Sequence, residues 1–297
     1  MSAPNAVTAR LGTAAGSAEE WLFGAEEGRR FRAVQIGLAA LLGLRVALGP
    51  YRDLAGQPAA LFDPPAVLRW LPGMPPLAVL VALQAVGALA ALLVLARVRP
   101  HAAFVVAWVA LVVLAGLRAS RGKILHNDVL LLLAAVPFLA ATAGSSLRDR
   151  RRAVRFGWPV RTAMVVVCGA YFWCGLAKLV SAGPLWAWSD NLRYVLYAGG
   201  HGTRTHAPDL ALFVADHGLA ARLLATGVLT LELVFPLALV RVGLRPWFAL
   251  GAAAMHASIW LLLGLDYWAW AGTAIVVLVD PAHLLNLRRL HRPQPRR

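Results

Sequence analysis

The chain has 297 residues, of which 60% are apolar and only 14% are charged, and its mean hydropathy is +0.66. Soluble globular domains carry about a quarter charged residues, so this composition excludes an ordinary water-soluble domain. The formal net charge of +15 would suggest nucleic acid in a soluble protein. Here the basic residues stand between long apolar runs, so we assign them to membrane topology and expect no nucleic-acid partner.

The first residues contain Glu19, Glu20, Glu26 and Glu27 and no early apolar core, which is wrong for a cleavable signal peptide. We predict that residues 1–28 form a retained and largely disordered cytoplasmic tail. Long apolar segments follow, and such segments are read as helices that cross a hydrocarbon core of about 30 Å. The predicted spans cover residues 33–50, 76–97, 101–118, 127–143, 159–180, 222–241, 246–263 and 266–284, and a basic tail covers residues 286–297.

The Lys and Arg residues are unevenly distributed between alternate connections of these spans. With the N-terminus inside, most of the 29 basic residues fall on the cytoplasmic side, which is the side where positive charge is retained. The sequence therefore predicts an all-α, multi-pass helical bundle of about eight transmembrane helices. We expect both termini in the cytoplasm and a location in a bacterial plasma membrane.

Two connections on the outer side are long, residues 51–75 and 181–221, so we expect the function to face outward. The second contains Trp186, Tyr194 and Tyr197 among apolar residues. This pattern is typical of an amphipathic helix in the membrane interface, and an aromatic anchor is the simpler interpretation.

Ionisable side chains within lipid-embedded segments cost about 2.5 to 3.5 kcal/mol each on the insertion scale, so they are candidates for function. Six such residues stand out, namely Arg45, His126, Asp128, Lys178, Glu232 and His256. Helical rise places His126, Asp128 and Lys178 at similar depths near the outer surface, with His256 about 10 Å deeper. These positions predict one outward-opening cavity.

A polar and small-residue stripe, Tyr171, Cys174, Gly175 and Lys178, would face the bundle interior at three- and four-residue spacings.

Each candidate also has a structural interpretation. Lys178 is close enough to a helix end to snorkel into the headgroups. Asp128 could be the N-cap of the fourth span. Glu232 and Arg45 could form a structural ion pair. His256 has no neighbouring metal-type ligand in sequence and fits a hydrogen-bonded structural histidine, so we predict no metal site.

The segment YFWCGLAKLVSAGPLWAWSDNLRYVL, residues 171–196, resembles the signature of the horizontally transferred transmembrane (HTTM) family, the membrane domain of vitamin K-dependent γ-carboxylase. Three further stretches look similar to the family: GLRVALGPYRDL with the following FDPP, HNDVLLLL, and MHASIWLLLGL. The resemblance covers most of residues 20–285 and implies an HTTM-like transmembrane domain over residues 29–285.

The resemblance also implies a chemistry. In the carboxylase, the lysine that matches Lys178 deprotonates reduced vitamin K, and a histidine in a stretch similar to HND supports that site. By this analogy Lys178 is the base, and His126 or Asp128 orients it. A neutral amine among apolar side chains is a suitable base. We expect His256, Tyr171 and Trp186 to contact a reduced, quinone-like cofactor.

The carboxylase has a large extracytoplasmic domain after its spans, whereas this chain ends at Arg297 in a basic tail. We therefore expect no peptide carboxylation by this chain alone, and a partner protein would have to supply such a domain. Two functions stay open. The first is a membrane protein whose outward-facing cavity binds or acts on a quinone-like lipophilic molecule, with lipids and that molecule as partners. The second is a non-enzymatic accessory protein for maturation of, or tolerance to, a secreted peptide, similar to the sporulation-delaying protein B family.

Overall fold

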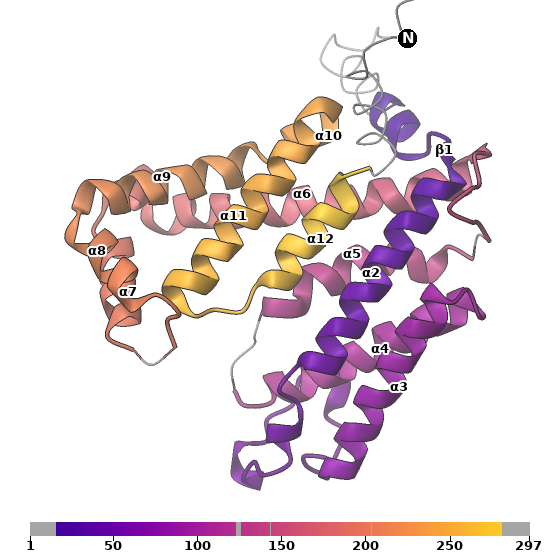
Figure 1. Cartoon of the computed structure of the whole chain (residues 1–297), viewed down its shortest axis with the longest axis horizontal. Coiled ribbons are helices and arrows are strands. Elements are labelled where there is room, and N and C mark those ends of the chain that lie inside the picture. The colour runs from indigo at the N-terminus through magenta and orange to yellow at the C-terminus, as the bar shows by residue number, and fades with distance from the viewer. Residues whose placement is uncertain (1–15, 123–125, 143, 203, 281–297) are drawn as a thin grey trace, which may run out of the picture.

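The structure is a computed structural model that describes residues 16–122, 126–142, 144–202 and 204–280 (Figure 1). Almost all of its regular structure is helical. In chain order the helices are α2 (Gly28–Leu48), α3 (Leu77–Leu95), α4 (Pro100–Ala119), α5 (Val129–Ala140), α6 (Val154–Ala182), α7 (Asn191–Gly200), α8 (Pro208–Asp216), α9 (Gly218–Val234), α10 (Leu237–Val240), α11 (Arg245–Leu263) and α12 (Trp268–Leu278). A short antiparallel pair joins β1 (Glu26–Glu27) to β2 (Arg152–Ala153).

Five helical segments are long and apolar enough to cross a membrane: Gly28–Leu48, Leu77–Leu95, Pro100–Ala119, Val154–Ala182 and Val242–Leu263. The pair α8 and α9 makes a sixth only if it counts as one span, and it bends by 102°. Helices α5 and α12 are apolar but have only 12 and 11 residues. A helix of that length rises less than about 20 Å and is shorter than the hydrocarbon core.

Within the described residues, the protein is therefore all-helical with five or six candidate membrane spans. The prediction of eight spans counted apolar residues. Among the described residues, the predicted spans at 127–143 and 266–284 contain helices of only 12 and 11 residues.

Helices α2, α3 and α4 pack through small residues. A Cβ added at Gly43 of α2 would lie 2.6 Å from the Cβ of Ala91, and one added at Gly87 of α3 would lie 2.7 Å from the Cβ of Ala110. Leucine side chains on the other face of α3 are exposed, among them Leu92. Close backbone approach through glycine and alanine, with leucine facing outward, is the packing of helices in lipid.

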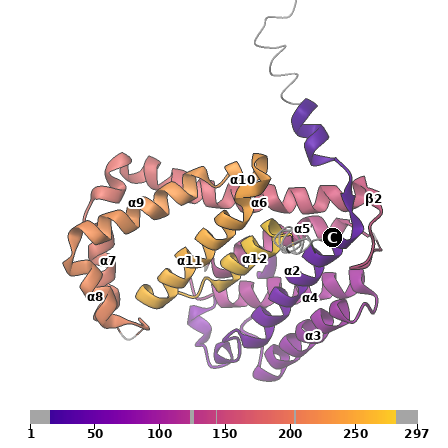
Figure 2. The same cartoon turned by 45° about the horizontal axis from the view of Figure 1, so that its top comes forward.

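Successive helices run back and forth between two ends of the bundle. We call them the Arg30 end, where α2 starts, and the Arg45 end, where α2 finishes. Helices α2 and α6 both begin at the Arg30 end, because β1 and β2 precede them and pair there. Arg30 donates a hydrogen bond of 3.0 Å to the carbonyl of Val277, which places the end of α12 at the same end (Figure 2). The last turn of α2 reaches the Arg45 end, where it meets the start of α5.

The predicted N-terminal tail lies only partly within the described residues. Residues 16–22 are helical and Glu26–Glu27 form β1, so this part of the tail has regular structure, and a largely disordered tail stays a prediction. The carbonyl of Trp21 accepts a hydrogen bond from Arg161, whose guanidinium also lies 5.7 Å from the centroid of the Trp21 ring. Residues 1–15 and the basic tail, residues 286–297, lie outside the described residues.

The long connection at residues 181–221 is partly helical. It contains the 3-10 turn Pro184–Trp188 followed by α7 and α8. In α7 Leu196 is buried and Tyr194 is exposed, so this segment is an amphipathic helix. Its place in a membrane interface stays a prediction.

Candidate ligand pocket

A pocket of about 380 Å³ lies between α6, α9, α11, α12 and the turn that precedes α5. Pockets of roughly 300 to 1,000 Å³ with mainly apolar walls are the usual sites for small molecules. The lining includes His126, Tyr171, Cys174, Glu232, His256 and Trp270. Four residues that the sequence had singled out from separate spans, His126, Tyr171, Glu232 and His256, are therefore brought together.

The stripe along α6 faces inward as predicted. Tyr171 and Cys174 line the pocket, and Gly175 is buried against α9, where an added Cβ would lie 3.0 Å from the Cβ of Glu232. Glycine at this position lets α9, which carries Glu232, approach α6 closely.

His256 is held at the wall of the pocket by Tyr171. The Tyr171 hydroxyl and His256 Nε2 share a hydrogen bond of 2.9 Å. The Tyr171 ring stacks on Phe235 with centroids 4.1 Å apart and planes 4° apart. The other ring nitrogen of His256, Nδ1, is buried and has no hydrogen-bond partner among the described residues. One imidazole nitrogen is thus fixed, and the other remains for a ligand or water.

Two aromatic residues that the sequence reasoning missed complete this wall. The ring centroids of Tyr267 and Trp270 lie 5.9 Å and 6.0 Å from that of His256, and both residues line the pocket. The signal in the sequence that could have identified them is the aromatic cluster DYWAW at the start of the last apolar run. Aromatic walls of this kind favour flat, conjugated ligands.

Lys178 lies behind the pocket wall and is paired with Glu232. Its Nζ atom lies 2.7 Å from Oε1 and 2.6 Å from Oε2 of that carboxylate, which lines the pocket. Trp186, predicted to contact a cofactor, instead lies beneath the ammonium, with its ring centroid 5.5 Å from Nζ. The alternative in which Glu232 pairs with Arg45 is wrong, because the two residues have different partners.

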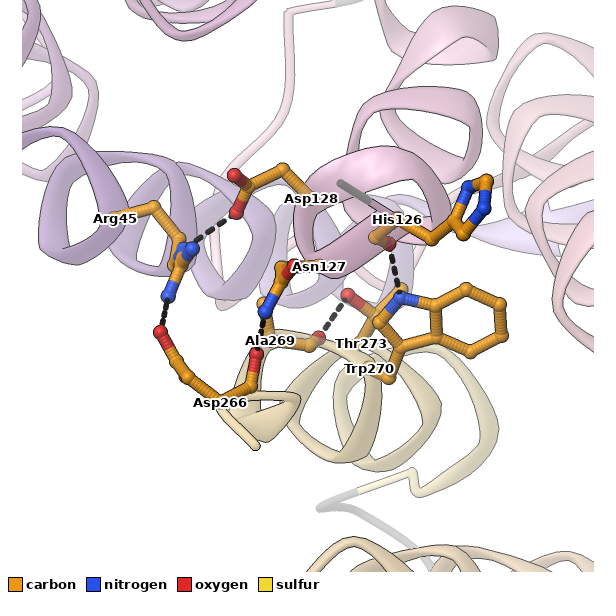
Figure 3. Close-up of polar contacts among 8 residues, drawn as sticks. All are labelled: Arg45, His126, Asn127, Asp128, Asp266, Ala269, Trp270 and Thr273. Atoms are coloured by element: carbon orange, nitrogen blue, oxygen red, sulfur yellow. Dashed lines mark hydrogen bonds and ion pairs between the residues drawn. The ribbon is translucent and has the colours of Figure 1, made fainter. Parts of the chain in front are cut away.

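Arg45 anchors a separate polar cluster (Figure 3). Its Nε atom donates to Asp128 Oδ1 at 2.5 Å, and Nη1 donates to Asp266 Oδ2 at 2.6 Å. The guanidinium also lies 5.2 Å from the centroid of the Trp268 ring, and Asn127 donates to the carbonyl of Asp266. Asp128 therefore contacts Arg45 and not Lys178, and its side chain makes no N-cap hydrogen bond.

The turn His126–Asp128 separates these two environments. The His126 side chain lines the pocket and points away from Arg45 in Figure 3, while Asn127 and Asp128 face the Arg45 cluster. Trp270 Nε1 donates to the carbonyl of His126 at 2.8 Å and fixes the turn against α12. Asp266, which the sequence reasoning also missed, carries no local signal beyond being an acid between two apolar runs.

Within the described residues, no group of three or more His, Cys, Asp or Glu side chains is placed to hold a metal ion. Comparison with protein-family models, curated proteins and solved structures finds no match to this chain. The residues of the pocket, together with the membrane-type helices around it, are thus the basis for assigning a function.

Proposed function

We propose that this protein is a multi-pass membrane protein that binds a lipophilic, ring-bearing molecule of the quinone class in the pocket between α6, α9, α11 and α12. The observation that supports this proposal is an aromatic pocket with few polar groups, set among helices with lipid-type outer faces. Tyr267 and Trp270 provide flat surfaces for a conjugated ring. Glu232 and His256 Nδ1 provide hydrogen-bond partners for ring oxygens.

The same pocket offers a route for a proton from a reduced quinone. Glu232 is the member of the ion pair that reaches the pocket, so its carboxylate accepts the proton of a ligand hydroxyl. The Lys178 base that the γ-carboxylase resemblance implies is an alternative to this route, because its ammonium must first give its proton to Glu232, which as a neutral acid no longer accepts the proton of the ligand. Proton transfer over the 2.6 Å contact leaves a neutral amine and a neutral carboxylic acid.

The membrane topology belongs to the same proposal. Arginines gather at the Arg30 end, which carries the turn between α3 and α4 and the connection between α5 and α6. The positive-inside rule then places this end, with both termini, in the cytoplasm and the Arg45 end outside. An HTTM-type fold in a plasma membrane is consistent with this arrangement.

Ligand occupancy of the pocket can be tested by filling it. Ile259 of α11 lines the pocket, whereas Leu250 of the same helix is exposed on the lipid-type face. We expect Ile259→Trp to reduce the amount of quinone-class molecule that co-purifies with the detergent-solubilised protein by about tenfold or more, since an indole replaces ligand volume. Leu250→Trp should leave that amount unchanged.

Mass spectrometry of organic extracts, with protein amount and thermal stability measured in parallel, provides the readout. Equal quinone content in wild type and both variants, or no quinone in any of them, would contradict the proposed function.

A further inference from the structure

A second pocket, of about 890 Å³, lies at the Arg30 end, where the start of α2 meets the turn between α3 and α4 and the connection between α5 and α6. Its charged lining residues are five arginines and one aspartate, namely Arg32, Arg97, Arg99, Arg148, Arg151 and Asp149. Among the ion pairs of the described residues, none involves Arg97, Arg99 or Arg148. The pocket is therefore strongly cationic.

The single acid of this pocket is already engaged. Arg151 donates from Nε to Asp149 Oδ1 at 3.0 Å and from Nη2 to Oδ2 at 2.8 Å. These hydrogen bonds lower the pKa of Asp149 to about 2, so the carboxylate is ionised and satisfied at neutral pH. The other four arginines of the pocket therefore have no acidic side chain there to balance their charge.

Arg32 is the deepest of these four, with only 2% of its surface exposed. Its Nη1 atom donates to Gln35 Oε1 at 2.7 Å, and Nη2 donates to the carbonyl of Val94 at 2.5 Å. Its Nε atom is buried without a hydrogen-bond partner among the described residues. Burying a cation without a counter-ion is costly, so an anion that enters the pocket would relieve the penalty.

Two neutral polar atoms at the same pocket are also unsatisfied. His101 Nδ1 and Ser145 Oγ are buried, and neither has a hydrogen-bond partner in the described part of the chain. Buried polar atoms are nearly always hydrogen-bonded in native proteins. Counting Arg32, three residues that line this pocket thus carry a buried polar atom with no hydrogen-bond partner among the described residues.

The backbone brings two of the arginines to this pocket in an uncommon conformation. Arg97 and Arg99 have φ angles of 65° and 42°, in the left-handed region that non-glycine residues seldom adopt. At Arg97 this conformation ends α3, because the backbone N–H groups of Arg97 and Val98 donate to the carbonyls of Val94 and Leu93. A topological signal alone would require basic residues in the loop but not a buried Arg32.

We propose that this pocket binds a phosphate group, carried by an anionic lipid or by a free phosphate. The planar guanidinium forks of Arg97 and Arg99 match phosphate oxygens in pairs, Arg32 adds a buried positive charge beside them, and His101 and Ser145 line the same pocket. The site lies at the Arg30 end of the bundle, opposite the end where Arg45 and the start of α5 meet, and it shares no lining residue with the pocket of Glu232 and His256.

The test uses the full-length protein in neutral detergent and in lipid nanodiscs. The variant R97N/R99N removes two pocket arginines, and asparagine tolerates the left-handed backbone. The control R150Q/R241Q removes two exposed arginines near the same end that do not line the pocket. A third variant, Arg148→Gln, removes an exposed pocket arginine if the double variant does not fold.

The first experiment measures the midpoint of thermal unfolding at increasing concentrations of inorganic phosphate. Chloride at the same ionic strength is the reference. The second experiment counts phosphatidylglycerol retained against phosphatidylcholine by native mass spectrometry. We expect wild type and control to bind, and R97N/R99N to bind at least about tenfold more weakly, because charge-assisted hydrogen bonds are lost.

Phosphate protection without lipid retention identifies a free phosphate, and selective phosphatidylglycerol retention identifies a lipid headgroup. If R97N/R99N, or Arg148→Gln in its place, behaves like the control in both experiments, the proposal is overturned.

Discussion

At the scale of single residues, Lys178 and Glu232 are the contact on which the proposed proton chemistry depends. The carboxylate is buried, with 6% of its side chain exposed, whereas 26% of the Lys178 side chain is exposed. Losing Lys178 therefore strands a buried charge, while losing Glu232 leaves an amine that can turn toward solvent or the headgroups.

We expect Lys178→Met to lower the free energy of unfolding by about 2 kcal/mol or more, because Glu232 is left unpaired in an apolar setting. Glu232→Gln should cost less, and the double variant K178M/E232Q should be more stable than K178M alone. Unfolding of the detergent-solubilised proteins, analysed as a double-mutant cycle, measures the coupling. Additive effects would mean that Lys178 is a headgroup anchor and not the partner of Glu232.

A second substitution at Lys178 distinguishes a side chain that must lose a proton from one that only supplies a positive charge. Lys178→Arg keeps the cation beside Glu232, but arginine is not deprotonated in proteins. We expect Lys178→Arg to preserve stability and ligand content while abolishing any change in the redox state of the bound molecule, which mass spectrometry of the extracted ligand reports. Unaltered ligand turnover in Lys178→Arg would remove Lys178 from the chemistry.

At the scale of elements, the Arg45 cluster connects α2, which is long enough to cross a membrane, to the starts of the two short helices α5 and α12. Arg45 belongs to α2, Asp128 stands directly before α5, and Asp266 stands in the connection between α11 and α12. Since α5 and α12 are too short to cross a membrane by themselves, their outer ends depend on such contacts with protein.

We expect Asp128→Asn to destabilise the protein more than Asp266→Asn, although both remove one contact of Arg45. The Asp128 side chain is 5% exposed and that of Asp266 is 38% exposed, so solvent compensates for the loss only at Asp266. Thermal unfolding of the two variants in one detergent gives the ranking. A larger loss for Asp266→Asn would show that the loop, rather than α5, depends on Arg45.

At the scale of the whole molecule, the alternating helices bring the start of α2 and the end of α12 to one end of the bundle. Figures 1 and 2 show the same arrangement from two directions. The described part of the bundle therefore starts and finishes at the same end.

The orientation can be measured with single cysteines in a background that lacks Cys168 and Cys174. Gly56 is exposed at the Arg45 end with no atom within 4 Å of an added Cβ, and Arg150 is exposed in the connection between α5 and α6. We expect an impermeant thiol reagent to label Gly56→Cys in intact cells and to leave Arg150→Cys unlabelled until the cells are lysed. The reverse pattern would invert the topology.

What the sequence determined by itself was the class of the protein, and it also predicted the approximate depth of the ionisable residues. Hydropathy is a local property, and the rise of 1.5 Å per residue converts sequence position into depth without knowledge of neighbours. His126, Asp128, Lys178 and His256 were therefore grouped before any packing was known, although Asp128 contacts Arg45 instead. The inward face of Tyr171 and Gly175 followed from helical spacing.

Only the tertiary structure decided which side chains meet. Glu232 pairs with Lys178 across 54 residues, and Arg45 contacts Asp128 and Asp266 across 83 and 221 residues. The depth of a residue in the membrane does not determine how its helix is rotated or which helices are its neighbours. Packing determines both, as at Gly175, where α9 lies close to α6. Partner choice among buried charges is for this reason a property of the folded bundle and not of any single span.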